Sequence, residues 1–328
     1  MPPPSCAAPG RCWARRADAG VAAMGAKIGI IGTGGVGESV ALSLLHFGTA
    51  GELVLNDVRQ DDAEGEAMDL VQGSPFYPTA RVRVGTVEEM LDCDAVVVTA
   101  GAGRAPGQSR LELQATNAGI VAGLGRRLRG ARGVVVVVTN PVDVMTLVMT
   151  RASALPPERV VGTGTMLDSA RLRQVLGREL DLDPRSIHGQ VVGEHGASEV
   201  VLWSGVRVGG RSLGRWPGWD EARRQRVTEE VRTAGQEVIR RKGATTHAIG
   251  LVTATLLKWM LRGARRVLTV SRVQDGALGL TGVALSLPTV LGPAGAVQVF
   301  EPDMTDAERE EVLRSAEVLR QAALGLPD

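Results

Sequence analysis

A glycine-rich turn directly after a short apolar segment is the feature that most restricts how this chain can fold. Residues 27–31 are predicted to form a strand, residues 32–37 read GTGGVG, and an amphipathic helix is predicted to follow. Gly32 permits a tight turn, Gly34 lets the backbone approach a pyrophosphate, and Gly37 lets helix and strand pack closely. Because the N–H groups at a helix N-terminus attract anions, the motif predicts a dinucleotide-binding site.

An acidic residue stands where such a site needs one. A second strand is predicted at 52–56, and Asp57 follows it, twenty residues beyond Gly37. A carboxylate there can accept hydrogen bonds from the hydroxyls of the adenosine ribose, and it repels the additional phosphate of NADP. The sequence therefore predicts NAD as the cofactor.

The same alternation of strand and helix continues along the first half of the chain. The valine run at 134–138 is typical of a strand buried on both faces of a parallel sheet. We therefore expect an α/β fold that begins with a Rossmann doubly wound parallel sheet, whose ligands gather at the carboxyl ends of its strands. Thr99 and Gly101 follow one such end, and Asn140 follows another. Three further strands are predicted, at 81–84, 95–99 and 133–139.

Beyond about residue 161 this regular alternation ends. Thr305 and Glu308 have the spacing of a capping box that opens a final helix. The second half is expected to be an α+β substrate/catalytic domain, with the active site between it and the first half. Helices are predicted over 166–180, 221–241 and 245–262, with extended segments around 191 and over 200–208, 266–273 and 282–289.

These patterns divide the chain into three parts. Residues 26–162 are expected to form the NAD-binding domain and residues 163–328 the catalytic domain. Residues 1–25 are rich in Pro, Ala and Arg, with Asp18 as their only acid, and have no periodic apolar pattern. We expect this segment to be a disordered tail or an overcalled start, with a transit peptide as the alternative.

Composition excludes several classes of function. The net charge of the 328 residues is +1, so nothing favours nucleic acid or an anionic membrane as a partner. No apolar run approaches the roughly 20 residues that cross a bilayer. The cysteines, Cys6, Cys12 and Cys93, lack the spacing of metal ligands. We therefore expect a cytoplasmic protein without disulfides or a bound metal.

Three clusters of charged residues could carry chemistry. Asp168 and Arg171 lie one helical turn apart, and His195 stands between glycines. Arg104 and Arg110 flank a Pro-Gly pair after the fourth strand. Taken singly, each has an ordinary explanation: a surface ion pair, a histidine that fills the core, and solvated arginines.

Together, these clusters resemble the L-lactate/malate dehydrogenase family, and the resemblance covers the chain from about Lys27 to the C-terminal helix. Many motifs in the right order make it specific, and it implies a homodimer or homotetramer that acts on a small 2-hydroxy or 2-keto acid. The segments that carry it are 32–37, Asp57, Thr99-Ala100-Gly101, Ser109-Arg110-Leu111, Thr139-Asn140-Pro141-Val142-Asp143, Leu167-Asp168-Ser169-Ala170-Arg171, Gly193-Glu194-His195-Gly196 and 245–250.

The resemblance implies a role for each site residue. His195 would be the general base that takes the hydroxyl proton, and Asp168 would orient it. Arg171 would bind the substrate carboxylate through two hydrogen bonds. Further binding residues are implied: Arg110, closing over the site and polarising the ketone oxygen; Asn140 and Thr245, lining the pocket; and Gly32, Gly34, Gly37, Asp57, Thr99, Gly101, Asn117 and Asn140, holding NAD.

Arg104 favours malate and oxaloacetate as the substrates. In the family, the residue six positions before the loop arginine contacts the variable end of the substrate, and it is arginine in malate dehydrogenases but glutamine in lactate dehydrogenases. With pyruvate bound, Arg104 would be buried without a partner, which predicts a roughly 10³–10⁴-fold preference for oxaloacetate over pyruvate. L-lactate dehydrogenase activity is the alternative, and a non-catalytic NAD-sensing scaffold is a distant one.

Other features favour lactate dehydrogenases. The segment 193–196, followed by Trp203-Ser204-Gly205, is similar to bacterial lactate dehydrogenases. Arg173 and His188 match the positions at which those enzymes bind fructose 1,6-bisphosphate at a subunit interface, although they could also be ordinary surface residues. The chain departs from the family at Ala197, where an acid is usual, and at Gly103, where an arginine is usual.

Overall fold

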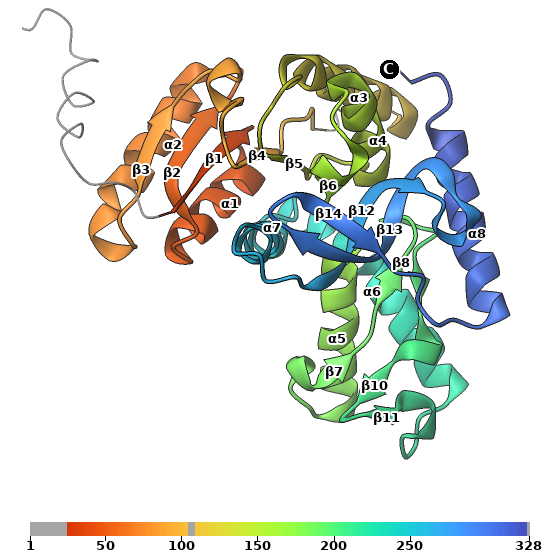
Figure 1. Ribbon diagram of the computed structural model, residues 1–328. Helices are drawn as coiled ribbons and strands as arrows, with labels where there is room; N and C mark the ends of the chain where they lie inside the picture. Colours follow the sequence, from red (N-terminus) through yellow and green to blue (C-terminus); the bar gives the residue numbers. More distant parts are fainter. Residues whose placement is uncertain (1–24, 104–108, 327–328) are drawn as a thin grey trace, which may run out of the picture.

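The computed structural model describes residues 25–103 and 109–326, apart from the side chain of Arg110. The main sheet is built from β1 (Ala26–Ile31), β2 (Ala50–Asn56), β3 (Arg81–Val84), β4 (Ala95–Val98), β5 (Val134–Val137), β6 (Val160–Gly162), β12 (Val267–Asp275), β13 (Thr281–Gly292) and β14 (Gly295–Val299). These strands lie in the order β14-β13-β12-β6-β5-β4-β1-β2-β3 (Figure 1). The predicted tail, residues 1–25, lies outside the described residues except for Gly25.

Six of these strands form the predicted parallel sheet. The order β3-β2-β1-β4-β5-β6 is parallel throughout and is that of a dinucleotide-binding Rossmann unit. Every residue of β4 and β5 is buried, which confirms the expectation drawn from the valine run. The sequence therefore located the central strands of the sheet correctly.

Helices cover both faces of the sheet. The helices in the described part of the chain are α1 (Gly35–His46), α2 (Gln60–Gln72), α3 (Arg110–Arg127), α4 (Val142–Ser153), α5 (Met166–Leu180), α6 (Glu221–Lys242), α7 (His247–Leu261) and α8 (Asp306–Ala322). One buried apolar cluster combines α3, α4 and α8 with the sheet, and another combines α1, α2 and α7 with its opposite face. Among the described helices, none is both long and apolar enough to cross a membrane.

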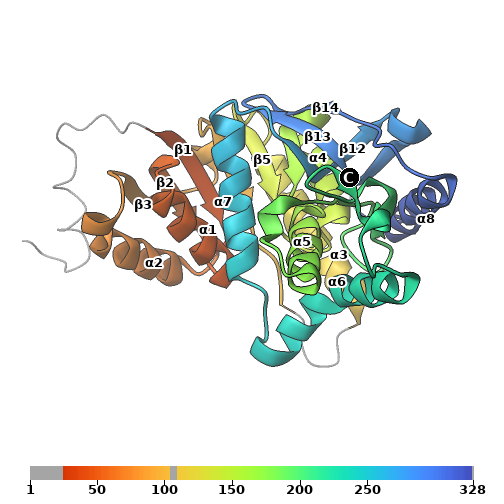
Figure 2. The same cartoon turned by 90° about the horizontal axis from the view of Figure 1, so that it is seen from below.

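The second half of the chain packs directly onto the first. Helix α7 lies beside α1 on the same face of the sheet (Figure 2). The two helices approach closely because Gly250 of α7 has no side chain, and a Cβ there would clash with Ser39 of α1. Strand β12 also pairs antiparallel with β6, so β12, β13 and β14 extend the Rossmann sheet.

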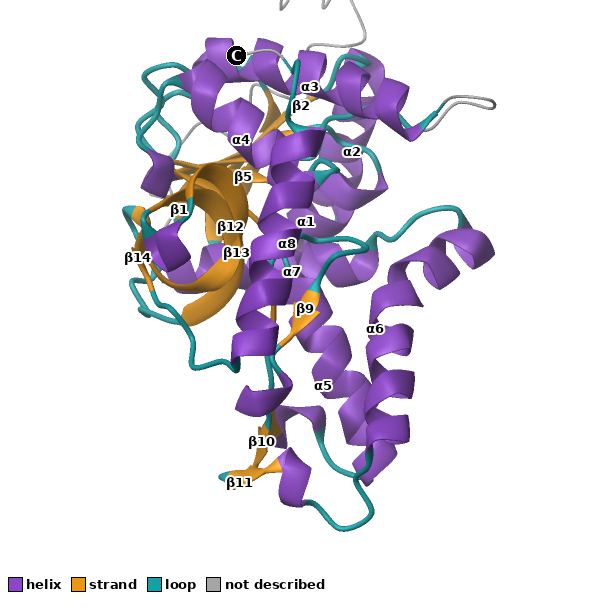
Figure 3. Ribbon diagram, turned by 90° about the vertical axis from the view of Figure 1, so that its right-hand side faces the viewer, coloured by secondary structure: helices purple, strands orange, loops and turns teal. Residues whose placement is uncertain are grey.

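A smaller lobe projects from this sheet. Helices α5 and α6 lie side by side in it (Figure 3), together with the short strands β7 (Ile187–His188), β10 (Arg207–Val208) and β11 (Arg211–Ser212). Strands β8 (Val191–Val192) and β9 (Val200–Val201) form a hairpin that leads back to the main sheet. Leu172, Leu176 and Val231 are among the residues of the apolar core of this lobe.

The segment 200–208 differs from the expected extended run. A 3₁₀ turn at Trp203–Gly205 separates β9 from β10. The carboxylate of Glu308 accepts hydrogen bonds from the Ser204 N–H (2.9 Å) and hydroxyl (2.6 Å), which turns the chain toward the start of α8. The predicted capping box of α8, formed by Thr305 and Glu308, is confirmed.

Candidate active site

The glycine turn between β1 and α1 has the shape that a bound dinucleotide requires. Gly32 has φ +101°, and a Cβ there would lie 2.6 Å from the amide nitrogen of Ala100. A Cβ on Gly37 would clash with the Gly32 carbonyl, whereas the space beside Gly34 is open. Helix α1 begins without a side-chain cap, which leaves N–H groups at its N-terminus for a pyrophosphate.

Asp57 lies at the end of β2 and faces this turn. Its carboxylate accepts hydrogen bonds from the N–H groups of Thr33 (2.8 Å) and Arg59 (3.0 Å). Burial raises the pKa of Asp57, but these hydrogen bonds outweigh burial and lower the pKa below its usual value. Asp57 therefore stays charged, as binding to ribose hydroxyls requires, and the residues present fit NAD.

The other predicted cofactor residues lie at the ends of β4 and β5 and, for Asn117, on α3 beside them. The Thr99 hydroxyl donates to the carbonyl oxygen of Gly32 (2.6 Å) and so holds the glycine turn. Asn117 is buried and joins the two strand ends: its Oδ1 accepts from the Ala102 N–H (2.8 Å), and its Nδ2 donates to the carbonyl of Asn140 (3.0 Å). Gly101 lies against Asn117, and the side chain of Asn140 is exposed.

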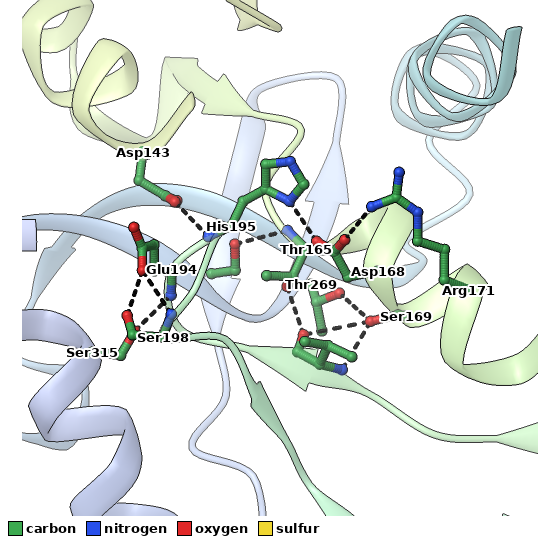
Figure 4. Close-up of polar contacts among 12 residues, drawn as sticks. Asp143, Thr165, Asp168, Ser169, Arg171, Glu194, His195, Ser198, Thr269 and Ser315 are labelled. Carbon is green, nitrogen blue, oxygen red and sulfur yellow. Dashed lines mark hydrogen bonds and ion pairs between the residues drawn. The ribbon is translucent and has the colours of Figure 1, made fainter. Parts of the chain in front are cut away.

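His195, Asp168 and Arg171 meet although they come from two separate elements. The histidine lies on the β8–β9 hairpin, and its Nδ1 is 2.5 Å from Oδ2 of Asp168 on α5 (Figure 4). The other oxygen of Asp168 accepts from Nη1 of Arg171 at 2.8 Å. Asp168 is buried, whereas 27% of the His195 side chain is exposed. Because Nδ1 is engaged with Asp168, Nε2 is the imidazole nitrogen left for another partner.

This carboxylate determines the protonation of the imidazole. Burial lowers the pKa of His195, but the charge and hydrogen bond of Asp168 outweigh burial and raise the pKa to about 9. Burial acts in the opposite sense on Asp168, and its two cationic neighbours keep its pKa below the usual value. At neutral pH, His195 therefore carries a proton that it can donate.

Residues that the sequence did not assign hold the hairpin in place. The backbone N–H of His195 donates to Asp143 of α4 (2.7 Å). The N–H of Glu194 donates to the hydroxyl of Ser315 on α8 (2.8 Å), and Gly193 exchanges two backbone hydrogen bonds with Ser286 of β13. Asp143 lies inside a predicted motif, but no local signal marks the two serines, because their partners are more than 90 residues away.

One further predicted substrate residue, Thr245, lies near the glycine turn, and two others lie outside the description. Thr245 is half-buried just before α7, whose neighbouring residue Thr246 lies against the glycine turn at Gly35. Arg104 lies outside the described residues, as does the side chain of Arg110, although the backbone of Arg110 begins α3.

Arg173 and His188 border a separate cavity of about 760 Å³. Arg207 stands opposite His188 in the β7–β10 pair, and Arg266 also lines the cavity. Burial and then the charge of Arg266 lower the pKa of Arg173. Among the described lining residues, Asp303 is the only acid, against three arginines, so positive charge predominates around the cavity.

Nearly the whole described chain matches known proteins. Residues 26–162 match the lactate/malate dehydrogenase NAD-binding domain, and residues 165–323 match the alpha/beta C-terminal domain of the same family. An L-lactate dehydrogenase of Synechococcus sp. (strain JA-3-3Ab) is 44% identical over 90% of this chain and 97% of its own length. One from Gloeobacter violaceus is 42% identical over 92% and 93%.

Solved structures agree with these matches. The minor L-lactate dehydrogenase of Enterococcus mundtii superposes with a TM-score of 0.88 at 37% identity, over 91% of this chain and 98% of its own. A lactate dehydrogenase from a deep-sea metagenome library of the Medee basin gives 0.87 at 33% identity, over 91% and 98%. The chain thus belongs to the lactate/malate dehydrogenase family of NAD-dependent 2-hydroxyacid oxidoreductases.

Proposed function

We propose that this enzyme reduces pyruvate to L-lactate with NADH and catalyses the reverse reaction with NAD. The observation that carries the proposal is its similarity, over about nine-tenths of the chain, to proteins named L-lactate dehydrogenase. The paired His195 and Asp168 provide a proton donor for the ketone of a 2-keto acid, and Arg171 beside them provides a cation for its carboxylate.

The proposed reaction assigns one task to each of these side chains. The glycine turn and Asp57 would hold NADH, which would supply the hydride when bound. Protonated His195 donates its proton from Nε2 to the ketone oxygen, because Nδ1 is engaged with Asp168. Arg171 binds the carboxylate of the substrate, and Asp168 orients the imidazole and stabilises its charge. In the reverse direction, neutral His195 accepts the hydroxyl proton.

We assign the remaining predicted residues to the surroundings of the reacting atoms. Arg110 would close over the substrate and polarise the ketone oxygen, which excludes water. Asn140 would hydrogen-bond the same oxygen, and Thr245 would line the pocket. Gly235 of α6 also faces Arg171, and a Cβ there would lie 3.4 Å from the guanidinium nitrogens.

Malate dehydrogenase activity is the second candidate, and Arg104 is the residue that favours it. With Arg171 on one carboxylate and Arg110 on the ketone oxygen, Arg104 is free to bind the second carboxylate of oxaloacetate. Pyruvate has no second carboxylate that could neutralise the charge of Arg104. Removing this charge should therefore affect the reaction with oxaloacetate differently from the reaction with pyruvate.

The deciding experiment compares kcat/KM for pyruvate and for oxaloacetate in the wild type, Arg104→Gln and Arg211→Gln. For a lactate dehydrogenase we expect pyruvate to be preferred by about 100-fold, or about 2.7 kcal/mol, and Arg104→Gln to change this little. A preference for oxaloacetate that Arg104→Gln reverses would instead establish the malate reaction. Arg211, exposed on β11, controls for the change in net charge.

We also propose that the chain works as two functional parts, residues 26–162 for NAD and residues 163–328 for the substrate. The boundary between the two family matches, at residues 162 and 165, supports this division.

The proposed location is the cytoplasm. Cys93 is buried with a free thiol, which suits a reducing compartment of this kind.

The cavity at Arg173 and His188 is proposed to bind a multiply charged anion such as fructose 1,6-bisphosphate at a contact between subunits of a homotetramer. Its support is the gathering of Arg173, His188, Arg207 and Arg266 around one space, with cations crowding one another. A phosphorylated ligand would relieve this repulsion by pairing with the guanidinium groups. A homodimer without such a site is the alternative.

Fructose 1,6-bisphosphate is therefore expected to lower KM for the keto acid by roughly tenfold, a coupling of ordinary size. Arg173→Gln should abolish this response, whereas Arg185→Gln, an exposed change of the same charge, should retain it. Steady-state kinetics and light scattering, each with and without the bisphosphate, measure the effect and the assembly. If the bisphosphate changes neither the KM nor the mass of the wild-type assembly, the proposal is contradicted.

A further inference from the structure

Three buried carboxyl groups interact with His195 through hydrogen bonds or charge, and the mechanism above uses one of them. Asp168 bonds the imidazole, and Asp143 accepts the backbone N–H of His195. The third is Glu199, four residues beyond His195 and directly before β9, with a relative exposure of 6%. Its backbone N–H donates to Gly196 (3.2 Å), which closes the turn that carries the histidine.

Glu199 differs from a buried glutamate that serves structure alone. The carboxylate of Glu308, buried to a similar degree, accepts hydrogen bonds from backbone and hydroxyl groups of Ser204 and Thr305. Oε1 of Glu199 is fully buried and makes no hydrogen bond with any residue in the described ranges. Such an unpaired oxygen is costly to bury, and most strongly so when it is charged.

The charges around Glu199 reinforce this effect. Burial, and then the negative charge of Asp168, raise the pKa of Glu199 to about 8, against the opposing charges of His195, Arg232 and Arg171. Glu199 is therefore neutral at pH 7 and becomes charged at a mildly alkaline pH. The titratable and charged groups that act on His195 are Asp168 and Arg171 from α5, Asp143 from α4 and Glu199 from its own hairpin. Glu194 acts on Asp143, and Arg232 of α6 acts on Glu199.

We propose that Glu199 is a positioning residue that sets the pH range over which His195 keeps its proton. The inference rests on the hydride-transfer reaction proposed above, for either keto acid. As the pH rises and Glu199 ionises, its negative charge stabilises the imidazolium. Reduction of the keto acid, which needs protonated His195, therefore continues to a higher pH than Asp168 alone would allow.

The test is the pH profile of kcat/KM for keto-acid reduction in Glu199→Gln. The amide matches the neutral acid in shape, so activity at pH 6–7 should stay within about twofold of the wild type. No negative charge develops at higher pH, so the apparent pKa of the alkaline limb should fall by about one unit. Glu64→Gln, an exposed change of the same charge on α2, should leave the profile unaltered.

Two kinetic outcomes would overturn the proposal: a profile identical to that of the wild type, or an equal loss of activity at every pH, which indicates a structural role. A titration followed by NMR of ¹³C-labelled glutamate carboxyls needs no turnover. It should show a signal titrating near pH 8 that is lost in Glu199→Gln or, if that variant fails to fold, in Glu199→Asp. Glu66, with a pKa of about 7, should titrate in all variants. The absence of the Glu199 signal from the wild type refutes the proposal even if the enzyme is active.

Discussion

Replacing His195 by asparagine is expected to lower kcat for keto-acid reduction by roughly 10²–10⁴-fold, the usual contribution of a positioned proton donor. The imidazole bonds the buried Asp168 through Nδ1, and its side chain is partly exposed. An asparagine amide has no acidic proton to donate in place of the one on Nε2. Asp168 keeps its ion pair with Arg171 in the variant, so the surrounding structure should persist.

Stopped-flow measurement of NADH oxidation at saturating substrate gives the chemical step directly. Binding of NADH, followed by fluorescence, serves as the control, because Asp57 and the glycine turn are held by Thr33, Arg59 and Thr99 and not by His195. A variant that binds NADH normally and retains more than about a tenth of the wild-type rate would remove His195 from the role of proton donor.

Arg171→Gln is expected to lower kcat/KM for the keto acid by roughly 10²–10⁴-fold. The physical reason is the loss of two charge-assisted hydrogen bonds to the substrate carboxylate, worth about 1.5–3 kcal/mol each. Nη1 of Arg171 also holds Asp168, so one planar guanidinium would both position Asp168 and bind the substrate. The loss should appear mainly in KM, since the carboxylate is bound before and during the reaction.

Two comparisons make this prediction specific. Arg178→Gln changes the same charge on the same helix, but Arg178 is exposed and pairs with Glu230, so its kinetics should match the wild type. Pyruvamide lacks the carboxylate, so Arg171→Gln should lower its reduction far less than it lowers that of pyruvate. Equal losses with pyruvate and pyruvamide would show that Arg171 does not bind the carboxylate.

The nucleotide-binding half could be predicted closely because short-range geometry determines it. The steric demands of the turn at 32–37 are local, and the structure places β1, α1 and β2 where the sequence predicted them. The buried valine strands were equally clear, since every residue of β4 and β5 is apolar. The helix 166–180 and the Thr305–Glu308 capping box follow from patterns within a few turns of helix.

Residues that act in pairs across the fold were less visible. Ser315 and Ser286 hold the hairpin of His195 from α8 and β13, and a serine carries no mark of such a partner in its own neighbourhood. Glu199 looks like an ordinary acid near a strand, and only the packing around it shows that Oε1 is buried and unpaired. The antiparallel extension of the sheet by β12, β13 and β14 likewise depends on pairing with β6.

The sequence by itself indicated the cofactor and the Rossmann sheet and singled out His195, Asp168 and Arg171 as candidate site residues, because motif spacing and residue chemistry are properties of the chain. The tertiary structure decided that the imidazole meets a carboxylate 27 positions away, and that the charges of this pair and of Arg171 outweigh burial to raise the pKa of His195 and lower that of Asp168. Burial and distance depend on how distant segments fill one core, so they arise only when the whole chain has folded.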